Sequence, residues 1–274
     1  MSIIEVMQQA VSQPAAGAFP QSKLSTVNLD DTGVRRRHVA TLLEVDVTRA
    51  RHQIRLTNRG GESAVSFMAW LVGNVARTLS DHPDARPAIP GRRRARRDTV
   101  TVSLLVDRSV GDYRTAMPLV IQDAETRAVG DIDSMIQRAR DEPADAATFV
   151  VGRPTGPVAA IYRALPALVR RGLLGIAVRN SRRLNRISGN VVISTSGMGG
   201  RVKGWFIPTG RHPICIGIGA VTPKAVVVNG TIEPRDVLHM SVLVDNSVVD
   251  GTPASRWMSR LLRSMESARE LQAG

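Results

Sequence analysis

Apolar and polar residues alternate along several short stretches of the chain, which is the pattern of half-buried β-strands. In residues 99–106, an extended backbone places four apolar side chains on one face, namely Val100, Val102, Leu104 and Val106. Similar reasoning predicts further strands at residues 38–47, 117–121, 191–195, 214–218, 225–228 and 237–244. Between two of these strands, the pair Asn229-Gly230 predicts a tight hairpin turn.

Other stretches repeat their apolar residues at intervals of three and four, as amphipathic helices do. This spacing predicts helices at residues 66–79, where Pro83 closes the segment, and at residues 132–140. A short helix at residues 3–11 and a basic amphipathic helix within residues 157–186 are also expected. The last helix has the clearest pattern, because Thr252 can cap it and Pro253 fits its first position. Its apolar stripe consists of Ala254, Trp257, Met258, Leu261, Leu262, Met265 and Ala268.

The order of these elements predicts an α/β fold of the α+β kind with a mixed sheet. The helices interrupt the strands too irregularly for a doubly wound sheet. Residues 1–37 are expected to form an N-terminal arm, with a turn at residues 30–33, and residues 38–274 to form one domain. The length of 274 residues is ample for such a core, and no internal repeat or low-complexity segment interrupts it.

Composition points to a soluble, cytoplasmic protein. No apolar run approaches the length of a membrane span, and residues 1–19 lack the pattern of a signal peptide. Cys215 is the single cysteine, so an intrachain disulfide is excluded. It lies inside an apolar strand and is interpreted as a small buried residue. We expect no membrane association.

The formal net charge is +13, and all but three of the 37 basic residues are arginines. A nucleic-acid partner is not expected, because the chain has only nine aromatic residues and none of the common nucleic-acid-reading motifs. The densest basic run, residues 92–97, is interpreted as a solvated loop, with docking of phosphates as the alternative. A basic surface also suits an acidic partner, such as the phosphates of coenzyme A or an acyl carrier protein.

The most informative segment follows the last predicted strand and reads Asp-Asn-Ser-Val-Val-Asp-Gly over residues 245–251. Together with the flanking residues 238–244 and 252–257, it resembles the C-terminal signature of the 2-oxoacid dehydrogenase acyltransferase catalytic domain, kin to chloramphenicol acetyltransferase. Residues 189–200, which read Gly-Asn-Val-Val-Ile-Ser-Thr-Ser-Gly-Met-Gly-Gly, resemble the family's glycine-rich strand and turn. Residues 213–219 and 38–47 resemble its following strand and its opening strand.

The resemblance implies a chloramphenicol acetyltransferase-like fold and a homotrimer whose active-site channel lies between subunits. An acyl thioester of coenzyme A or of an acyl carrier protein would enter one end, and a small-molecule acceptor the other. No bound cofactor and no metal are expected. The chain shows neither a lipoyl domain nor a subunit-binding domain ahead of residue 38, so it resembles the stand-alone members, which include O-acetyltransferases of polyketide pathways.

The same resemblance assigns the site residues. A histidine serves as general base in the family, but Asn246 stands at that position here, and an amide cannot accept a proton. The family's oxyanion-stabilising hydroxyl falls on Ser194, and Asp250 matches an aspartate that holds the active-site loop. The channel-lining positions expected to bind substrate are Thr195, Ser196, Gly197 and His38.

Two further residues near this signature are interpreted as structural. By the same analogy, Asp245 supports the loop and takes no part in the chemistry. His239 lies on the face of its strand opposite to Asn246, so it is a poor candidate for a replacement base.

Three functions stay open at this point. The first is O-acyl transfer to a small hydroxylated metabolite, with the missing base supplied by the substrate, by Asp250 or by another histidine. The second is a binding or scaffold trimer without catalysis. The third is a polyketide cyclase, in which Asn246 and Ser194 would act as hydrogen-bond donors.

Overall fold

The computed structural model describes residues 37–60, 64–87, 99–110, 113–141, 189–195, 203–208, 210, 212–268 and 271. The helices predicted at residues 3–11 and 157–186, the turn at 30–33, the basic run at 92–97, Ser196 and Gly197 therefore lie outside the described residues.

A six-stranded sheet forms the centre of the described structure, with the order β1-β6-β5-β4-β2-β3. Its strands are β1 (His38–Asp46), β2 (Val102–Val110), β3 (Tyr113–Ile121), β4 (Val191–Thr195), β5 (Ile214–Val228) and β6 (Thr231–Asp245). Strand β4 runs parallel to β2 and β5, whereas the other neighbours are antiparallel. The mixed sheet that the sequence predicts is confirmed.

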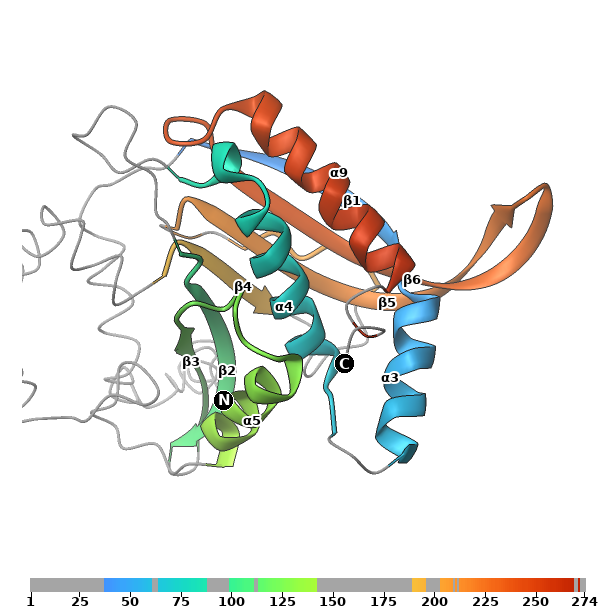
Figure 1. The fold of residues 1–274 in the computed structure, drawn as a ribbon, viewed down its shortest axis with the longest axis horizontal. Helices are drawn as coiled ribbons and strands as arrows, with labels where there is room; N and C mark the ends of the chain where they lie inside the picture. Colours follow the sequence, from blue (N-terminus) through green and yellow to red (C-terminus); the bar gives the residue numbers. More distant parts are fainter. Residues whose placement is uncertain are drawn as a thin grey trace, which may run out of the picture.

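Helices cover one face of this sheet (Figure 1). They are α3 (Thr48–Gly60), α4 (Phe67–Ser80), α5 (Val129–Asp141) and α9 (Gly251–Ser267), with a short 3-10 turn at Pro83–Ala85. Helix α4 lies centrally and packs against both α5 and α9. It begins at the N-cap Ser66, whose hydroxyl accepts a hydrogen bond from the amide of Ala69 at 3.2 Å.

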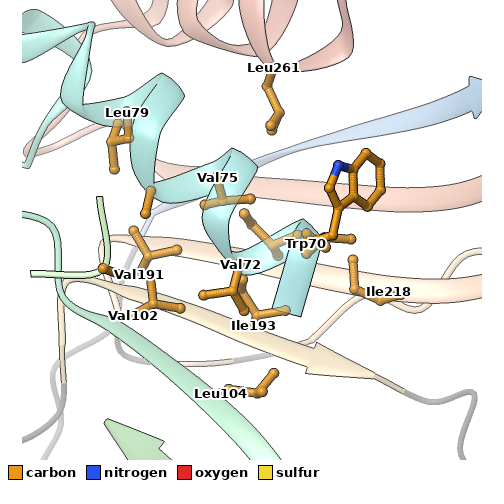
Figure 2. Close-up of a cluster of buried hydrophobic side chains, with 14 of the residues drawn as sticks. Trp70, Val72, Val75, Leu79, Val102, Leu104, Val191, Ile193, Ile218 and Leu261 are labelled. Carbon is orange, nitrogen blue, oxygen red and sulfur yellow. The ribbon is translucent and has the colours of Figure 1, made fainter. Parts of the chain in front are cut away.

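The main core lies between α4 and the sheet, as Figure 2 shows. Side chains of α4 meet β-branched and leucine side chains of β2 and β4, with Ile218 of β5 and Leu261 of α9 at the edges. The labelled members are Trp70, Val72, Val75, Leu79, Val102, Leu104, Val191, Ile193, Ile218 and Leu261. The alternation that predicts the strand at residues 99–106 thus corresponds to the buried side of β2.

Buried polar side chains join α4 to α9. The amide of Asn74 donates to the carbonyl of Trp70 at 3.0 Å, and its side-chain oxygen accepts from the hydroxyl of Ser264 at 2.9 Å. One turn further along α4, the hydroxyl of Thr78 accepts from the indole Nε1 of Trp257 at 3.2 Å. Because the four side chains that bridge the helices are buried, these hydrogen bonds fix how α9 sits on α4.

Residues 203–208 cross the other face of the sheet over β5 and β6, and we call them the crossing segment. The hydroxyl of Ser241 donates to the carbonyl of Phe206 at 2.5 Å, and the indole of Trp205 donates to the carbonyl of Leu43 at 3.0 Å. The segment lies so close to β5 that a methyl group at Gly217 or Gly219 would overlap its backbone. These two glycines therefore allow the crossing segment to pack directly on the sheet.

The hairpin of β5 and β6 extends beyond the rest of the sheet (Figure 1). The strands that flank the hairpin end earlier, β1 at Asp46 and β4 at Thr195. Beyond these points β5 and β6 pair only with each other, up to the pair Val228↔Thr231. At the tip, Asn229 and Gly230 both have positive φ, 51° and 85°, as a two-residue primed turn requires. The predicted hairpin turn is confirmed, and the separate strands predicted at residues 214–218 and 225–228 are one long strand.

Two other predictions need correction. Helix α3 has no counterpart in the prediction, because only Ala50 and Ile54 of its residues are buried and the remaining pattern is polar. The last helix begins earlier than predicted, with Asp250 as N-cap, so Thr252 and Pro253 are its second and third helical residues. Pro253 is tolerated there because the first-turn amides have no partner within the helix.

Candidate functional site

The Asp-Asn-Ser segment forms a tight turn at the end of β6. The buried carboxylate of Asp245 accepts hydrogen bonds from the Ser247 amide at 3.0 Å and the Ser247 hydroxyl at 2.6 Å. Its backbone carbonyl accepts from the amides of Val248 and Val249. Asp245 therefore holds the turn, in keeping with the structural role expected for it, and it leaves the next residue, Asn246, exposed to solvent.

Asn246 lies beside the first residues of β1. Its backbone N–H donates to the backbone carbonyl of Arg37 at 3.2 Å. The residue before it, Asp245, pairs with His38 in the sheet. The Nε2 of His38 lies 2.9 Å from the carbonyl oxygen of His212. Because a carbonyl can only accept, Nε2 carries the proton of that hydrogen bond, and in the neutral ring Nδ1 holds a free lone pair.

His212 belongs to the same corner of the sheet. It precedes Pro213, whose carbonyl accepts from the amide of Asp245 at 2.8 Å. No motif or spacing in the sequence marks His212 as a site residue. The one available indication was that it directly precedes residues 213–219, which resemble a strand of the family. The neighbouring Cys215 is fully buried, with its thiol 3.4 Å from the carbonyl of His212, as expected for a small apolar residue.

Asp250 occupies the start of α9, four residues after Asn246. Its carbonyl accepts from the amide of Ala254 at 3.1 Å, but its side chain makes no capping hydrogen bond. The residue is exposed. Within the described ranges, its carboxylate is thus neither a cap nor half of an ion pair, and it stays available to a ligand.

Ser194 lies on β4, in register with Gly217 of β5. It is buried, with 8% of its surface exposed, and its hydroxyl forms no hydrogen bond with the described residues. Thr195 follows at the end of the strand and is half-buried. A buried hydroxyl without a fixed partner among these residues can still donate to a ligand that reaches it.

One chain does not bring Ser194 and Asn246 together. Ser194 of β4 pairs with Gly217 of β5, and Gly217 in turn pairs with Ser241 of β6, so Ser194 and Ser241 are separated by two strand spacings. Asn246 follows Ser241 by five residues along the chain. With about 4.8 Å between strands and about 3.3 Å per residue, the two residues are about 19 Å apart. Ser194 lies near the carboxyl end of β4, whereas His38 and Asn246 lie at the opposite end of the sheet.

His239 is occupied elsewhere, as expected from its place on β6. It is buried, its Nδ1 lies 3.1 Å from the carbonyl of Ala220, and its ring meets Trp205 edge-on at 4.7 Å. Nearby, the ammonium of Lys224 lies 2.6 Å from the carboxylate of Glu44 and lowers the pKa of that carboxyl group. This cluster ties the crossing segment to the sheet and is remote from Asn246.

Neither a metal site nor a membrane span is found in the described part of the chain. There, no three histidine, cysteine, aspartate or glutamate side chains converge in a way that could hold a metal ion. None of the helices described has both the length and the apolar character needed to cross a bilayer.

Comparison with known proteins identifies the segment around this turn. Residues 187–273 match the family 2-oxoacid dehydrogenases acyltransferase (catalytic domain). This C-terminal segment is therefore similar to that acyltransferase family. It includes Ser194, Asn246 and Asp250, and the resemblance found in the sequence is confirmed. No curated protein matches the sequence.

Solved structures extend the acyltransferase fold over nearly the whole chain. A probable dihydrolipoamide acetyltransferase from Listeria monocytogenes 4b F2365 is 14% identical, with 93% of this chain and 95% of that chain covered and a TM-score of 0.64. The cubic core of the pyruvate dehydrogenase multienzyme complex is 17% identical, with 96% of each chain covered and a TM-score of 0.63. A dihydrolipoamide acetyltransferase from Azotobacter vinelandii is 20% identical, covers 91% of this chain and 90% of that chain, and has a TM-score of 0.57.

Proposed function

We propose that the protein is an acyltransferase that moves an acetyl or similar group from a thioester to a hydroxyl group of a small metabolite. The donor is acyl-CoA or an acyl carrier protein, since the family that matches residues 187–273 uses acyl-CoA as co-substrate. For the Azotobacter vinelandii enzyme, a serine, a histidine 52 residues later and an asparagine four residues after that were investigated for their role in the catalytic mechanism. Ser194, Asn246 and Asp250 stand at the same two spacings.

The separation of about 19 Å between Ser194 and Asn246 is the observation that carries the proposal for the site. A reacting carbonyl carbon must lie within about 3–3.5 Å of its attacking atom, and the oxyanion donor must contact the same carbonyl group. One chain cannot meet both conditions with these residues. We therefore propose a homotrimer in which residues 38–274 form the catalytic domain and each site combines Ser194 of one copy with the Asn246 corner of the next.

Ser194 is proposed as the oxyanion donor. When the acceptor oxygen attacks the thioester, the carbonyl oxygen gains negative charge, and a hydroxyl group that is free to rotate can donate to it. Because Ser194 is buried, little water competes for this hydrogen bond. Donors of this kind contribute about 3–4 kcal/mol to transition-state stabilisation.

His38 is proposed as the base that replaces the family's histidine. Its Nε2–H is held by the His212 carbonyl, so Nδ1 is the proton acceptor in the neutral ring. Nδ1 would take the proton of the acceptor hydroxyl as that oxygen bonds to the thioester carbon. Collapse of the tetrahedral intermediate then breaks the carbon–sulfur bond, and the leaving thiolate takes the proton back from the ring. Asn246 would orient the acceptor through its amide.

The experiment is release of free thiol from acetyl-CoA, in the presence and absence of hydroxylated acceptors, together with the mass of the product. The proposal requires thiol release that depends on the acceptor, with a product heavier by one acetyl group. Absence of thiol release with all donors, including an acetylated carrier protein, would favour a binding trimer. A product of unchanged mass would instead indicate the polyketide cyclase alternative.

His38→Ala and His212→Ala separate the two imidazoles at the corner. A large loss of acyl transfer in His38→Ala, with retention of the rate in His212→Ala, supports His38 as the base. The opposite result would assign the base to His212. A purely structural role of His38 would lower stability and leave the rate per folded protein unchanged.

A further inference from the structure

A concave site lies apart from Ser194 and from the Asn246 corner, since none of these residues lines it. It is a cavity of about 710 Å³ between the extended β5–β6 hairpin, the start of α3 and the last turns of α9. Its volume is in the range of sites for organic ligands and is much larger than a single ion needs. The charged side chains that line it are Arg49, Arg235, Arg260, Arg263, Asp46 and Glu266.

Among the described residues, three of the four arginines in this cavity have no anionic partner. Arg235 is neutralised, with Glu233 at 2.5 Å and Asp46 at 3.7 Å. Arg49, Arg260 and Arg263 form no ion pair with any residue of the described ranges. They come from two different helices, α3 and α9, and all three line the same cavity. Their positive charges are not neutralised by an ion pair with a described residue.

The placement of these arginines follows from the helix geometry. Arg260, Arg263 and Ser267 are spaced by three and four residues and share one side of α9, beside the stripe that packs on the core. Arg49 is the second residue of α3. It directly follows a turn in which the carboxylate of Asp46 accepts a hydrogen bond from the backbone N–H of Thr48 at 2.9 Å. Both helices pack on the core, so the guanidinium groups start from rigid positions.

The cavity also has an apolar wall. Val226 and Val228 of β5 line it, and both are half-buried in the hairpin extension. A ligand that fits this cavity therefore has an anionic part for the arginines and an apolar or aromatic part for the two valines. Guanidinium groups bind phosphate oxygens through paired N–H donors, which makes phosphate the anion that such a cluster suits best.

We propose that this cavity binds an organic ligand with two or more phosphate groups, of the nucleoside diphosphate type, through Arg49, Arg260 and Arg263. The apolar part of the ligand packs on Val226 and Val228. The proposal is independent of acyl transfer, because it concerns another part of the molecule and can be tested by binding alone.

Glu266 modulates this site. It lies on the same stretch of α9 as the arginines, and partial burial together with the neighbouring carboxylate of Asp46 raises the pKa of its carboxyl group. When Glu266 is ionised, its negative charge opposes an anionic ligand. Removing that charge should therefore tighten binding, whereas removing an arginine should weaken it.

The test is a calorimetric titration of the full chain with ADP at physiological ionic strength. We expect Arg260→Ala and Arg263→Ala each to weaken ADP binding by about tenfold or more, as loss of a charge-assisted contact does. Glu266→Gln should strengthen binding several-fold. Arg256→Ala is the matched control, because Arg256 is an exposed arginine of α9 that does not line the cavity.

Three results would overturn the proposal: no binding of ADP, equal weakening by Arg256→Ala and Arg263→Ala, or pyrophosphate binding as tightly as ADP. Equal weakening would mean that the net positive charge attracts anions without a site. Pyrophosphate binding as tightly as ADP would mean that the apolar wall contributes nothing. A thermal melt of each variant verifies that the substitutions leave the fold intact.

Competition between coenzyme A and ADP shows whether the phosphate groups that bind here belong to the acyl donor or to another ligand. If coenzyme A displaces ADP and Arg263→Ala weakens the binding of coenzyme A as it weakens that of ADP, the phosphates belong to the acyl donor. If coenzyme A does not displace ADP, the ligand is a separate nucleotide-like molecule. Both outcomes support the site, and neither depends on whether Ser194 or His38 is catalytic.

Discussion

Gly217→Ala tests whether the crossing segment is held against the sheet as closely as the structure indicates. The new methyl group would lie 2.6 Å from the Cδ of Pro208 and would overlap both the Phe206 carbonyl and the Ser241 hydroxyl. Because one of these neighbours is backbone, the crossing segment has to move away from β5. That movement also breaks the hydrogen bond from Ser241 to Phe206.

The expected loss of stability follows from these two effects. Overpacking of a close-packed site costs about 1–3 kcal/mol, and the lost hydrogen bond costs about 1 kcal/mol. Together they amount to about 2–4 kcal/mol, which corresponds to a decrease in Tm of about 5–15 °C for a chain of this size. Urea denaturation and a thermal melt both measure the effect.

Gly130→Ala provides the matched control. Gly130 lies in the first turn of α5 and does not have positive φ, and a methyl group added to it would meet no other atom within 4 Å. Alanine there should raise the stability by about 0.5 kcal/mol, because it reduces the freedom of the unfolded chain. If Gly217→Ala were as stable as Gly130→Ala, the close packing of residues 203–208 on β5 would be refuted.

Three further predictions concern the site and the core. Ser194→Ala should lower acyl transfer by about 100- to 1,000-fold, the effect of losing one oxyanion donor, and an unchanged rate of thiol release would remove Ser194 from the mechanism. Asn246→His should lower thiol release, because the side-chain amide proposed to orient the acceptor is lost while His38 already supplies the base, and an increase of about 100-fold or more, the contribution of a general base, would show that the native site lacks one. Ser264→Ala should destabilise the fold by about 1–3 kcal/mol in urea denaturation, because it leaves the buried oxygen of Asn74 without its partner, whereas the exposed Ser259→Ala should change stability by less than about 0.5 kcal/mol.

Strands and helices with a buried stripe were predictable because their pattern is set by burial. The alternation of Val102, Leu104 and Val106 marks the side of β2 that faces the core, and β4 has the predicted bounds. Helix α3 was not predictable in the same way. Its position depends on contacts made after folding, such as the ion pair of Arg51 with Asp236 at 2.9 Å, and these have no periodic signal.

The candidate site was predictable only as a set of residues. The resemblance selected Ser194, Asn246 and Asp250, but the spacing of 52 residues between the first two does not reveal that β4 and the end of β6 point to opposite ends of the sheet. His212 comes close to His38 only because β1, β5 and β6 meet at one corner. The arginine cavity likewise joins residues from β5, β6, α3 and α9, which no local pattern brings together.

Subunit mixing tests most directly whether the site is shared between copies. Ser194→Ala and His38→Ala proteins are unfolded together in equal amounts, refolded and assayed for thioester cleavage. If each site takes Ser194 from one copy and His38 from the next, random reassembly leaves about a quarter of the interfaces with both native residues and restores about a quarter of the native activity. Activity of the mixture equal to the mean of the two separate variants would contradict a shared site and place the complete catalytic apparatus within one chain.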